Sequence, residues 1–128
     1  MIYFDSSVVL AELLMEDRRP PPGLWEEFAV SSALLRYEVW NRMHSRSLAK
    51  ARADDIQLLL SKILLFDLRA DVLERALHPF SVSLRTLDSL HLATMHYLRA
   101  QGREVALATY DRRLMAAAQA LDFEAVPI

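Results

Sequence analysis

The alternation of short apolar runs with segments of helical spacing constrains the fold of this chain more than any other feature of its sequence. Apolar runs expected to form strands occupy residues 1–4, 64–68, 104–109 and 123–127. Strands that alternate with helices favour a parallel sheet covered on both faces. With 128 residues, the chain has the length of one domain, residues 1–128. We therefore expect a single α/β domain built on a central, mostly parallel sheet with helices on both faces.

Capping residues and helix breakers set the expected helix boundaries. Ser6 or Ser7 can cap a first helix, and the proline-rich segment 17–23 is a break in the chain. Gly102 stands in the usual position just past a helix end. The other expected helices are a short one over 24–29, one from Ser32 to about Ser45, one from Ser47 to about Leu64 that completes an antiparallel hairpin, one over 70–77, one capped by Thr86 and reaching about Ala100, and one capped by Asp111 and reaching about Leu121.

The composition excludes several classes of site. The chain has no cysteine, so it has no disulfide, no thiolate zinc site and no cysteine nucleophile. Its formal net charge of −2 disfavours extended, non-specific binding along nucleic acid backbones. No apolar run is long enough to span a bilayer, and the first residues lack the basic start of a signal peptide. We therefore expect a cytoplasmic protein with no membrane contact.

Four acidic residues are placed to meet at one edge of the expected sheet. Asp5 and Asp111 each follow a strand and precede a helix, and Asp88 lies in the first turn of its helix. Glu38 falls in the second turn of a helix rich in apolar residues, so its carboxylate needs a partner. In a parallel sheet, the carboxyl ends of the strands and the amino ends of the following helices share an edge where ligands bind. Taken singly, Asp5, Asp88 and Asp111 are explained equally well as acids that stabilise helix N-termini.

Taken together, these carboxylates predict a divalent metal site. Several carboxylates within a few ångströms of one another cannot all ionise without a counter-cation. Oxygen ligands without cysteine suit a hard ion such as Mg²⁺ or Mn²⁺. Such an ion can activate a water for attack on a phosphodiester. The sequence therefore predicts that Asp5, Glu38, Asp88 and Asp111 are the metal ligands and catalytic residues of a hydrolytic site.

Four segments, in this order and at this spacing, resemble one known family. They are MIYFDSS, LLRYEVWNRM, LRTLDSLHLATM and LATYDRRLMAAA, and the terminal FEAVPI extends the likeness. The chain resembles the PIN-domain family, specifically the small VapC-type ribonuclease toxins of toxin–antitoxin pairs. The resemblance implies a PIN-like fold and an endoribonuclease that depends on Mg²⁺ or Mn²⁺ held by the same four acids. It also implies an RNA substrate, a homodimer, and a cognate antitoxin that occupies the site.

Two hydroxyl residues are expected to support the site. By the resemblance, Ser6 falls where a small hydroxyl residue bonds an acidic ligand or a water. Thr109 ends its strand two residues before Asp111 and can hydrogen-bond in the site. Strand propensity explains Thr109 equally well.

Basic residues near the acids are candidates for substrate contacts. Arg85 and Arg112 can contact RNA phosphates at the rim of the site, although single exposed arginines are more often solvated surface charges. His91 follows Asp88 by three residues on the same helix face. It can contact substrate or orient Asp88, but a structural histidine is the simpler interpretation.

Two other functions stay open on the sequence alone. The first is a non-catalytic PIN-like module that binds RNA or a protein partner, with the acids serving as helix caps. The second is a phosphatase-like enzyme that uses Asp5 as its nucleophile. That chemistry usually requires a second Asp two residues further on, where this chain has Ser7.

Overall fold

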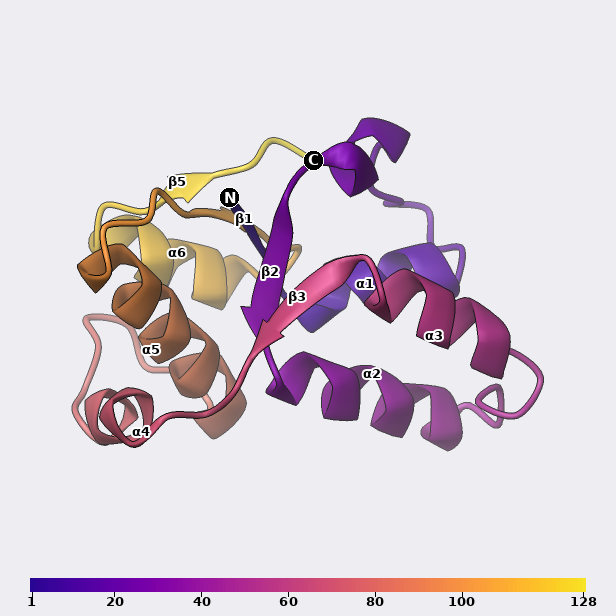
Figure 1. Cartoon of the computed structure of the whole chain (residues 1–128), viewed down its shortest axis with the longest axis horizontal. Coiled ribbons are helices and arrows are strands. Elements are labelled where there is room, and N and C mark those ends of the chain that lie inside the picture. Colours follow the sequence, from indigo (N-terminus) through magenta and orange to yellow (C-terminus); the bar gives the residue numbers. More distant parts are fainter.

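A computed structural model describes all residues from Met1 to Ile128 and contains one five-stranded sheet (Figure 1). Every neighbouring pair of strands is parallel, and the strand order is β3-β2-β1-β4-β5. The strands are short: β1 Ile2–Phe4, β2 Ala29–Ser32, β3 Ile63–Phe66, β4 Ala106–Ala108 and β5 Glu124–Ala125. The expected α/β architecture with a parallel sheet is confirmed.

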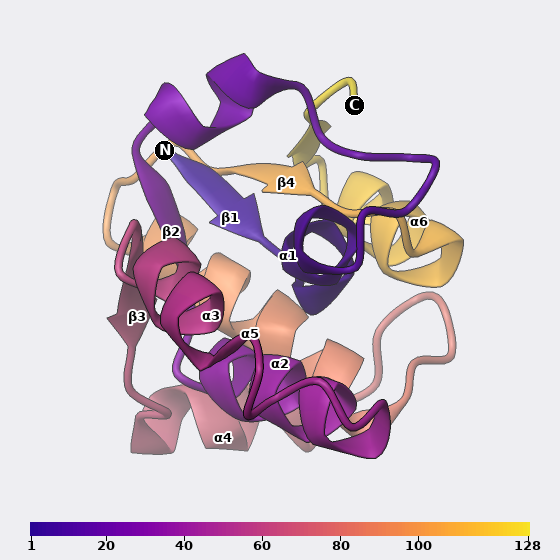
Figure 2. The ribbon, with the colours of Figure 1, turned by 90° about the vertical axis from the view of Figure 1, so that its right-hand side faces the viewer.

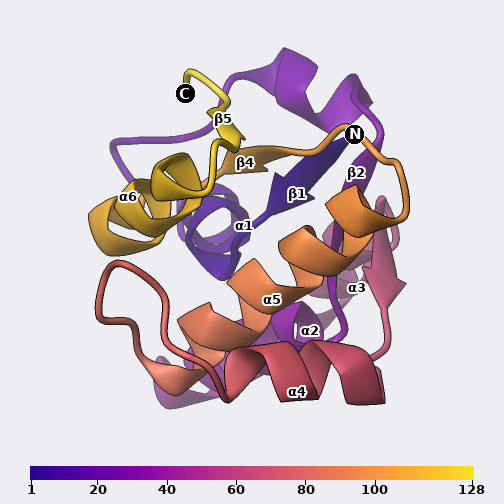
Figure 3. The ribbon, with the colours of Figure 1, turned by 90° about the vertical axis from the view of Figure 1, so that its left-hand side faces the viewer.

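Helices cover both faces of this sheet. On one face lie α1 Ser6–Leu13, α2 Leu34–Ser45 and α3 Ala53–Leu60 (Figure 2). On the other face lie α5 Thr86–Ala100 and α6 Arg112–Ala120, with α4 Ala70–Ala76 packed against α5 (Figure 3). A 3₁₀ helix, η1 Pro22–Glu26, leads into β2. None of these helices has the length and apolar character needed to cross a membrane.

Alternation along β1 divides the core into two halves. Phe4 packs among residues of α1, α2 and α3, whereas Tyr3 packs among residues of α5 and α6. Successive side chains of a strand point to opposite faces, so these two neighbours serve the two layers of helices. Both side chains are fully buried. Tyr3 is thereby directed toward α5, which carries Asp88 and His91.

The chain order of the strands creates a switch point between β1 and β4. From β1 the chain proceeds outward through β2 and β3, and then returns to place β4 and β5 on the opposite side of β1. The helices that follow β1 and β4 lie on opposite faces of the sheet. In open parallel sheets, a crevice forms outside the strand ends at such a point, and ligands bind there. Asp5 follows β1 directly, and Asp111 follows β4 by three residues.

The expected helix from Ser47 to Leu64 is wrong at both ends. Ser47 has a φ of 57°, in the left-handed region, so the chain turns there instead of starting a helix. α3 therefore covers only Ala53–Leu60, and the strand expected over 64–68 is β3, Ile63–Phe66. Helices α2 and α3 still lie side by side as the expected antiparallel hairpin (Figure 1).

Other differences concern short elements and caps. The helix expected over 24–29 is η1, and Ala29 already belongs to β2. Asp5, rather than either serine after it, is the N-cap of α1. Ser32 ends β2, and its hydroxyl accepts the Leu34 N–H at 3.2 Å, although Ala33 occupies the N-cap position of α2. Likewise, the residue at the N-cap of α5 is Arg85, whose side chain makes no capping bond, and Thr86 begins the helix.

Candidate active site

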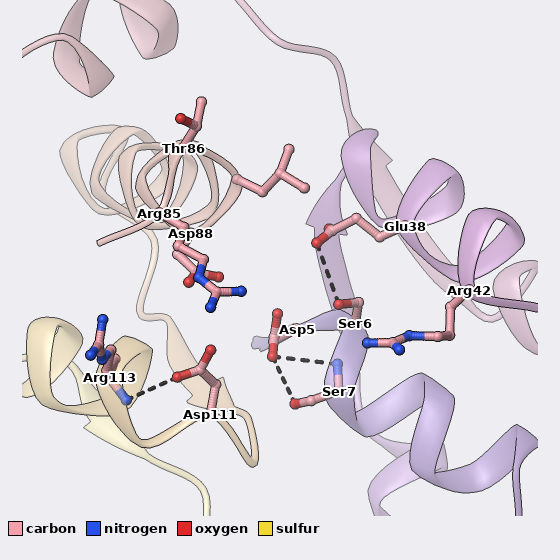
Figure 4. A pocket seen from close by; sticks show the side chains of 11 residues that line it. Asp5, Ser6, Ser7, Glu38, Arg42, Arg85, Thr86, Asp88, Asp111 and Arg113 are labelled. Carbon is pink, nitrogen blue, oxygen red and sulfur yellow. Dashed lines mark hydrogen bonds between the residues drawn. The ribbon is translucent and has the colours of Figure 1, made fainter. Parts of the chain in front are cut away.

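A polar pocket lies at the switch point, and all four predicted carboxylates line it. Eleven residues form its wall, and only one of them is hydrophobic. Figure 4 shows the carboxylates of Asp5, Asp88 and Asp111 directed into a common space, with Glu38 reaching in from α2. The lining residues are Asp5, Ser6, Ser7, Glu38, Arg42, Arg85, Thr86, Leu87, Asp88, Asp111 and Arg113.

Asp5 is held rigidly by hydroxyl groups from both sides of the switch point. Its Oδ2 atom accepts hydrogen bonds from Ser7 Oγ at 2.7 Å, from Thr109 Oγ1 at 2.8 Å and from the Ser7 N–H at 3.4 Å. The residue is only 4% exposed. All three bonds reach the same oxygen, so Oδ1 is uncommitted and available to a ligand.

Ser7 and Thr109 also fix the loop that leads to Asp111. The Tyr110 N–H donates to Ser7 Oγ at 2.9 Å, and the Asp111 N–H donates to Thr109 Oγ1 at 2.9 Å. Thr109 therefore makes the hydrogen bonds expected of it in the site. The sequence did not identify Ser7 as a site residue. Its place two residues after the N-cap Asp5 was a usable signal, since an N-cap side chain bonds a backbone N–H at that position.

Asp111 combines a capping role with its place in the pocket. Its Oδ1 atom accepts the Arg113 N–H at 2.9 Å and the Leu114 N–H at 3.1 Å, which confirms the predicted cap of α6. The other oxygen, Oδ2, makes no hydrogen bond within the protein. The capping bonds on one oxygen therefore leave the second oxygen for a ligand. Asp111 can thus serve both as the cap of α6 and as a metal ligand.

Asp88 has a raised pKa in this cluster of acids. Its half-buried carboxylate lies in the first turn of α5 but does not act as the cap. Burial, followed by the charges of Asp111, Asp5 and Glu38, raises the pKa of Asp88 from 3.8 to about 6, against a smaller opposing effect of His91. Like charges at short range disfavour ionisation, so a bound cation would relieve this repulsion.

Glu38 has its partner in His91. The side chain is 16% exposed, its Oε1 atom is hydrogen-bonded to His91 Nε2, and its Oε2 atom accepts a weak bond from Ser6 Oγ at 3.4 Å. Burial lowers the pKa of His91, yet the hydrogen bond to Glu38 and the charges of Glu38, Asp5 and Asp88 outweigh burial and raise that pKa above its usual value. His91 thus contacts Glu38, not Asp88, and Ser6 bonds an acidic residue of the pocket.

The donor set has the chemistry that Mg²⁺ or Mn²⁺ requires, because carboxylate oxygens are the preferred ligands of these hard ions. As the side chains stand, however, no three His, Asp or Glu residues are arranged to hold a metal ion. The raised pKa of Asp88, which comes first from burial and then from the charges of Asp111, Asp5 and Glu38, shows that these carboxylates still influence one another across the pocket. Asp5 Oδ1 and Asp111 Oδ2 are free of protein partners and face the pocket as uncommitted oxygen donors.

Three arginines border the acids. Arg42 comes from α2, Arg85 precedes α5, and Arg113 lies in the first turn of α6. None of the three forms an ion pair with a carboxylate. The structure places the expected Arg85 in the lining but leaves Arg112 outside it, because adjacent residues on a helix point about 100° apart and Arg113 takes the inward position.

Comparisons with known proteins agree with the geometry. The model of the PIN domain family matches residues 2–120. Ribonuclease VapC46 of Mycobacterium tuberculosis is 35% identical over 94% of this chain and 92% of the relative. Ribonuclease VapC35 of the same organism is 28% identical over 98% and 96% of the two chains. A chain of a toxin–antitoxin complex from Klebsiella pneumoniae has the same fold, with a TM-score of 0.65 and 18% identity over 94% of each chain.

Proposed function

The chain belongs to the PIN domain family, and from this membership we propose that it is a VapC-type toxin, an endoribonuclease that depends on Mg²⁺ or Mn²⁺. One observation carries the proposal: four carboxylates from four separate segments line a single polar pocket at the switch point of the sheet. Relatives of nearly the same length are named ribonucleases, which supports RNA as the substrate. We place its action in the cytoplasm.

The four acids share one role in the proposed site but differ in how firmly the protein holds them. Asp5, Glu38, Asp88 and Asp111 would hold the divalent ion. When bound, the ion would supply Lewis acidity for the attack of water on an RNA phosphodiester. Asp5 is fixed before any ligand arrives, because Ser7 and Thr109 already occupy its Oδ2 atom. Asp88 has no such bonds, so we expect it to adjust most when the ion binds.

The arginines suit the phosphates of the substrate. Arg42, Arg85 and Arg113 surround the acidic centre and have no carboxylate partners to displace. Guanidinium groups bind phosphate oxygens in bidentate fashion. We propose that these side chains hold the phosphates on either side of the scissile bond. A rim of arginines around an acidic centre also reconciles a net charge of −2 with binding of an RNA strand.

We further propose two protein partners, a cognate antitoxin and a second copy of the chain. Tyr37 of α2 and Leu58 of α3 are each 64% exposed on the helical hairpin, which suits a protein ligand at that surface. Leu73 of α4 and Leu77, its C-cap, are 43% and 77% exposed and line an apolar hollow against α5, which suits contact with another copy. Light scattering of the chain alone and with co-expressed antitoxin tests both partners.

RNA cleavage by the purified chain, freed of antitoxin, tests the proposed activity. We expect cleavage of single-stranded RNA with Mg²⁺ or Mn²⁺ and none with a chelator. Loss of an outer-shell partner of a metal site costs about 10–100-fold in activity, so loss of a ligand in Asp5→Asn should cost at least about 100-fold. Asp17→Asn, at an exposed acid outside the pocket, is the control and should cleave as wild type. Equal cleavage by Asp5→Asn would contradict the site assignment.

A non-catalytic binding module is the second candidate. It is favoured by the capping bonds of Asp5 and Asp111, which give both acids a structural purpose. Metal binding separates the two functions, because a ligand that binds only the folded state raises the melting temperature. A nuclease should gain stability from Mn²⁺ and lose that gain in Asp88→Ala. A module should show no Mn²⁺ shift and normal stability in Asp88→Ala.

A further inference from the structure

A continuous chain of hydrogen bonds runs through the core and ends on Glu38. The Ser32 N–H at the end of β2 donates to the Tyr3 hydroxyl at 3.1 Å. That hydroxyl is 2.7 Å from His91 Nδ1, and the opposite ring atom, Nε2, is bonded to Glu38 Oε1. Tyr3 and His91 are both 0% exposed. This series of hydrogen bonds therefore connects β2, β1 and α5 to Glu38 on α2, and only Glu38 is exposed to solvent.

The bond between Tyr3 and His91 reverses with the protonation state of His91, whereas the bond to Glu38 keeps its direction. The Tyr3 oxygen accepts the Ser32 N–H, so the Tyr3 proton can be donated to Nδ1 of a neutral His91. The ring proton then resides on Nε2 and is donated to Glu38. In an imidazolium, Nδ1 donates to the Tyr3 oxygen instead, and Nε2 still donates to Glu38. Glu38 thus receives an N–H from His91 in either protonation state.

We propose that Tyr3 and His91 are positioning residues that lock Glu38 before a metal ion or RNA arrives. Occupation of Oε1 by His91 directs Oε2 toward the pocket, where it has only the weak 3.4 Å bond from Ser6. Carboxylates that ligate a metal ion are themselves held by hydrogen bonds, and loss of such outer partners strongly weakens metal affinity. This inference rests on the proposed function and adds to it the residues that set the geometry of Glu38.

The same bond ties together two helices that border the pocket. Asp88 and His91 lie one turn apart on α5, while Glu38 lies on α2. The Glu38–His91 bond therefore connects the helix that carries Glu38 to the helix that carries Asp88, in the buried layer beside the pocket that these two acids line. An apolar residue of similar volume would fill the space of His91 but would leave Glu38 without this connection.

A matched pair of substitutions at His91 separates positioning from packing. His91→Gln keeps an N–H donor near the position of Nε2, whereas His91→Asn keeps one near Nδ1 and withdraws the donor from Glu38. We expect His91→Asn to weaken Mn²⁺ binding by about 10–100-fold, measured from the free Mn²⁺ signal in electron paramagnetic resonance. His91→Gln should recover most of that affinity. Cleavage by His91→Asn should lose kcat, with KM for RNA little changed.

A double-mutant cycle with Glu38→Gln completes the test. If His91 acts through Glu38, adding His91→Asn to Glu38→Gln should weaken Mn²⁺ binding by less than about twofold further. Additive losses, or wild-type affinity in His91→Asn, would overturn the inference. If His91→Asn does not fold, Tyr3→Phe takes its place, and wild-type Mn²⁺ affinity in Tyr3→Phe overturns it equally. A wild-type chain that neither binds Mn²⁺ nor cleaves RNA would instead refute the proposed function, and this inference with it.

Discussion

Replacing Asp88 with Asn is expected to stabilise the metal-free protein while it abolishes cleavage. The rise of its pKa from 3.8 to about 6 corresponds to about 3 kcal/mol, at about 1.4 kcal/mol per pKa unit. Because the carboxylate is half-buried, screening by solvent reduces this to about 1–2 kcal/mol. With an unfolding entropy of about 2.1 cal/mol/K per residue, that gain raises the melting temperature by about 4–7 °C.

The expected gain depends on pH in a defined direction. A raised pKa means that the folded protein binds the Asp88 proton more tightly than the unfolded chain does. Ionised Asp88 therefore destabilises the fold, and this destabilisation grows as the pH rises from 3.8 to about 6. Below that window both states hold a protonated Asp88, and Asn and Asp should be nearly equivalent. Above it, the full stabilisation by Asn should be present and constant.

Urea denaturation in the presence of a chelator, at several values between pH 4 and 8, measures this difference. Asp54→Asn is the matched control, since Asp54 lies in the first turn of α3, is exposed, and is outside the acidic pocket. That control should lose about 0.3–1 kcal/mol at neutral pH, because it removes only a favourable interaction with the helix dipole. If Asp88→Asn is destabilised at pH 8 like the control, or differs from wild type equally at pH 4 and pH 8, the raised pKa of Asp88 that burial and the neighbouring carboxylates produce is refuted.

Substitutions at three further positions, Asp111, Arg113 and Thr109, probe the site independently of Asp88. Asp111→Asn should keep the cap of α6 but lose RNA cleavage, whereas Asp111→Ala should also lose about 1 kcal/mol of stability in urea denaturation. Arg113→Gln should raise KM for RNA severalfold and reduce its dependence on salt, and Arg112→Gln, outside the lining, should change neither. Thr109→Val removes a donor to Asp5 and should cost about 1–3 kcal/mol in the same denaturation assay.

Features that depend on local sequence could be predicted well. The bounds of α5, Thr86–Ala100, agree with the expected helix, because helical spacing and the glycine after it are local signals. Asp111 caps α6 as predicted for the same reason. The start of α3 could not be predicted, since residues 48–52 are compatible with a helix and the turn arises from the left-handed conformation of Ser47.

Features that depend on contacts between distant segments could not be predicted from the sequence. The bond between Glu38 and His91 joins residues 53 positions apart, and the bond between Asp5 and Thr109 joins residues 104 positions apart. A parallel-sheet topology predicts that the acids meet at one edge. It does not predict which carboxylate oxygen accepts a hydrogen bond from which residue. The choice of Arg113 over Arg112 likewise depends on the rotation of α6, which no local pattern specifies.

Crystals grown with Mn²⁺ give the most direct test of the central claim. One or two peaks are expected in the anomalous difference map, within coordination distance of Asp5, Glu38, Asp88 and Asp111. Asp5 should coordinate through Oδ1 and Asp111 through Oδ2, since their other oxygens are held by protein groups. Catalytically active protein whose crystals bind Mn²⁺ elsewhere, or not at all in this pocket, would contradict the account.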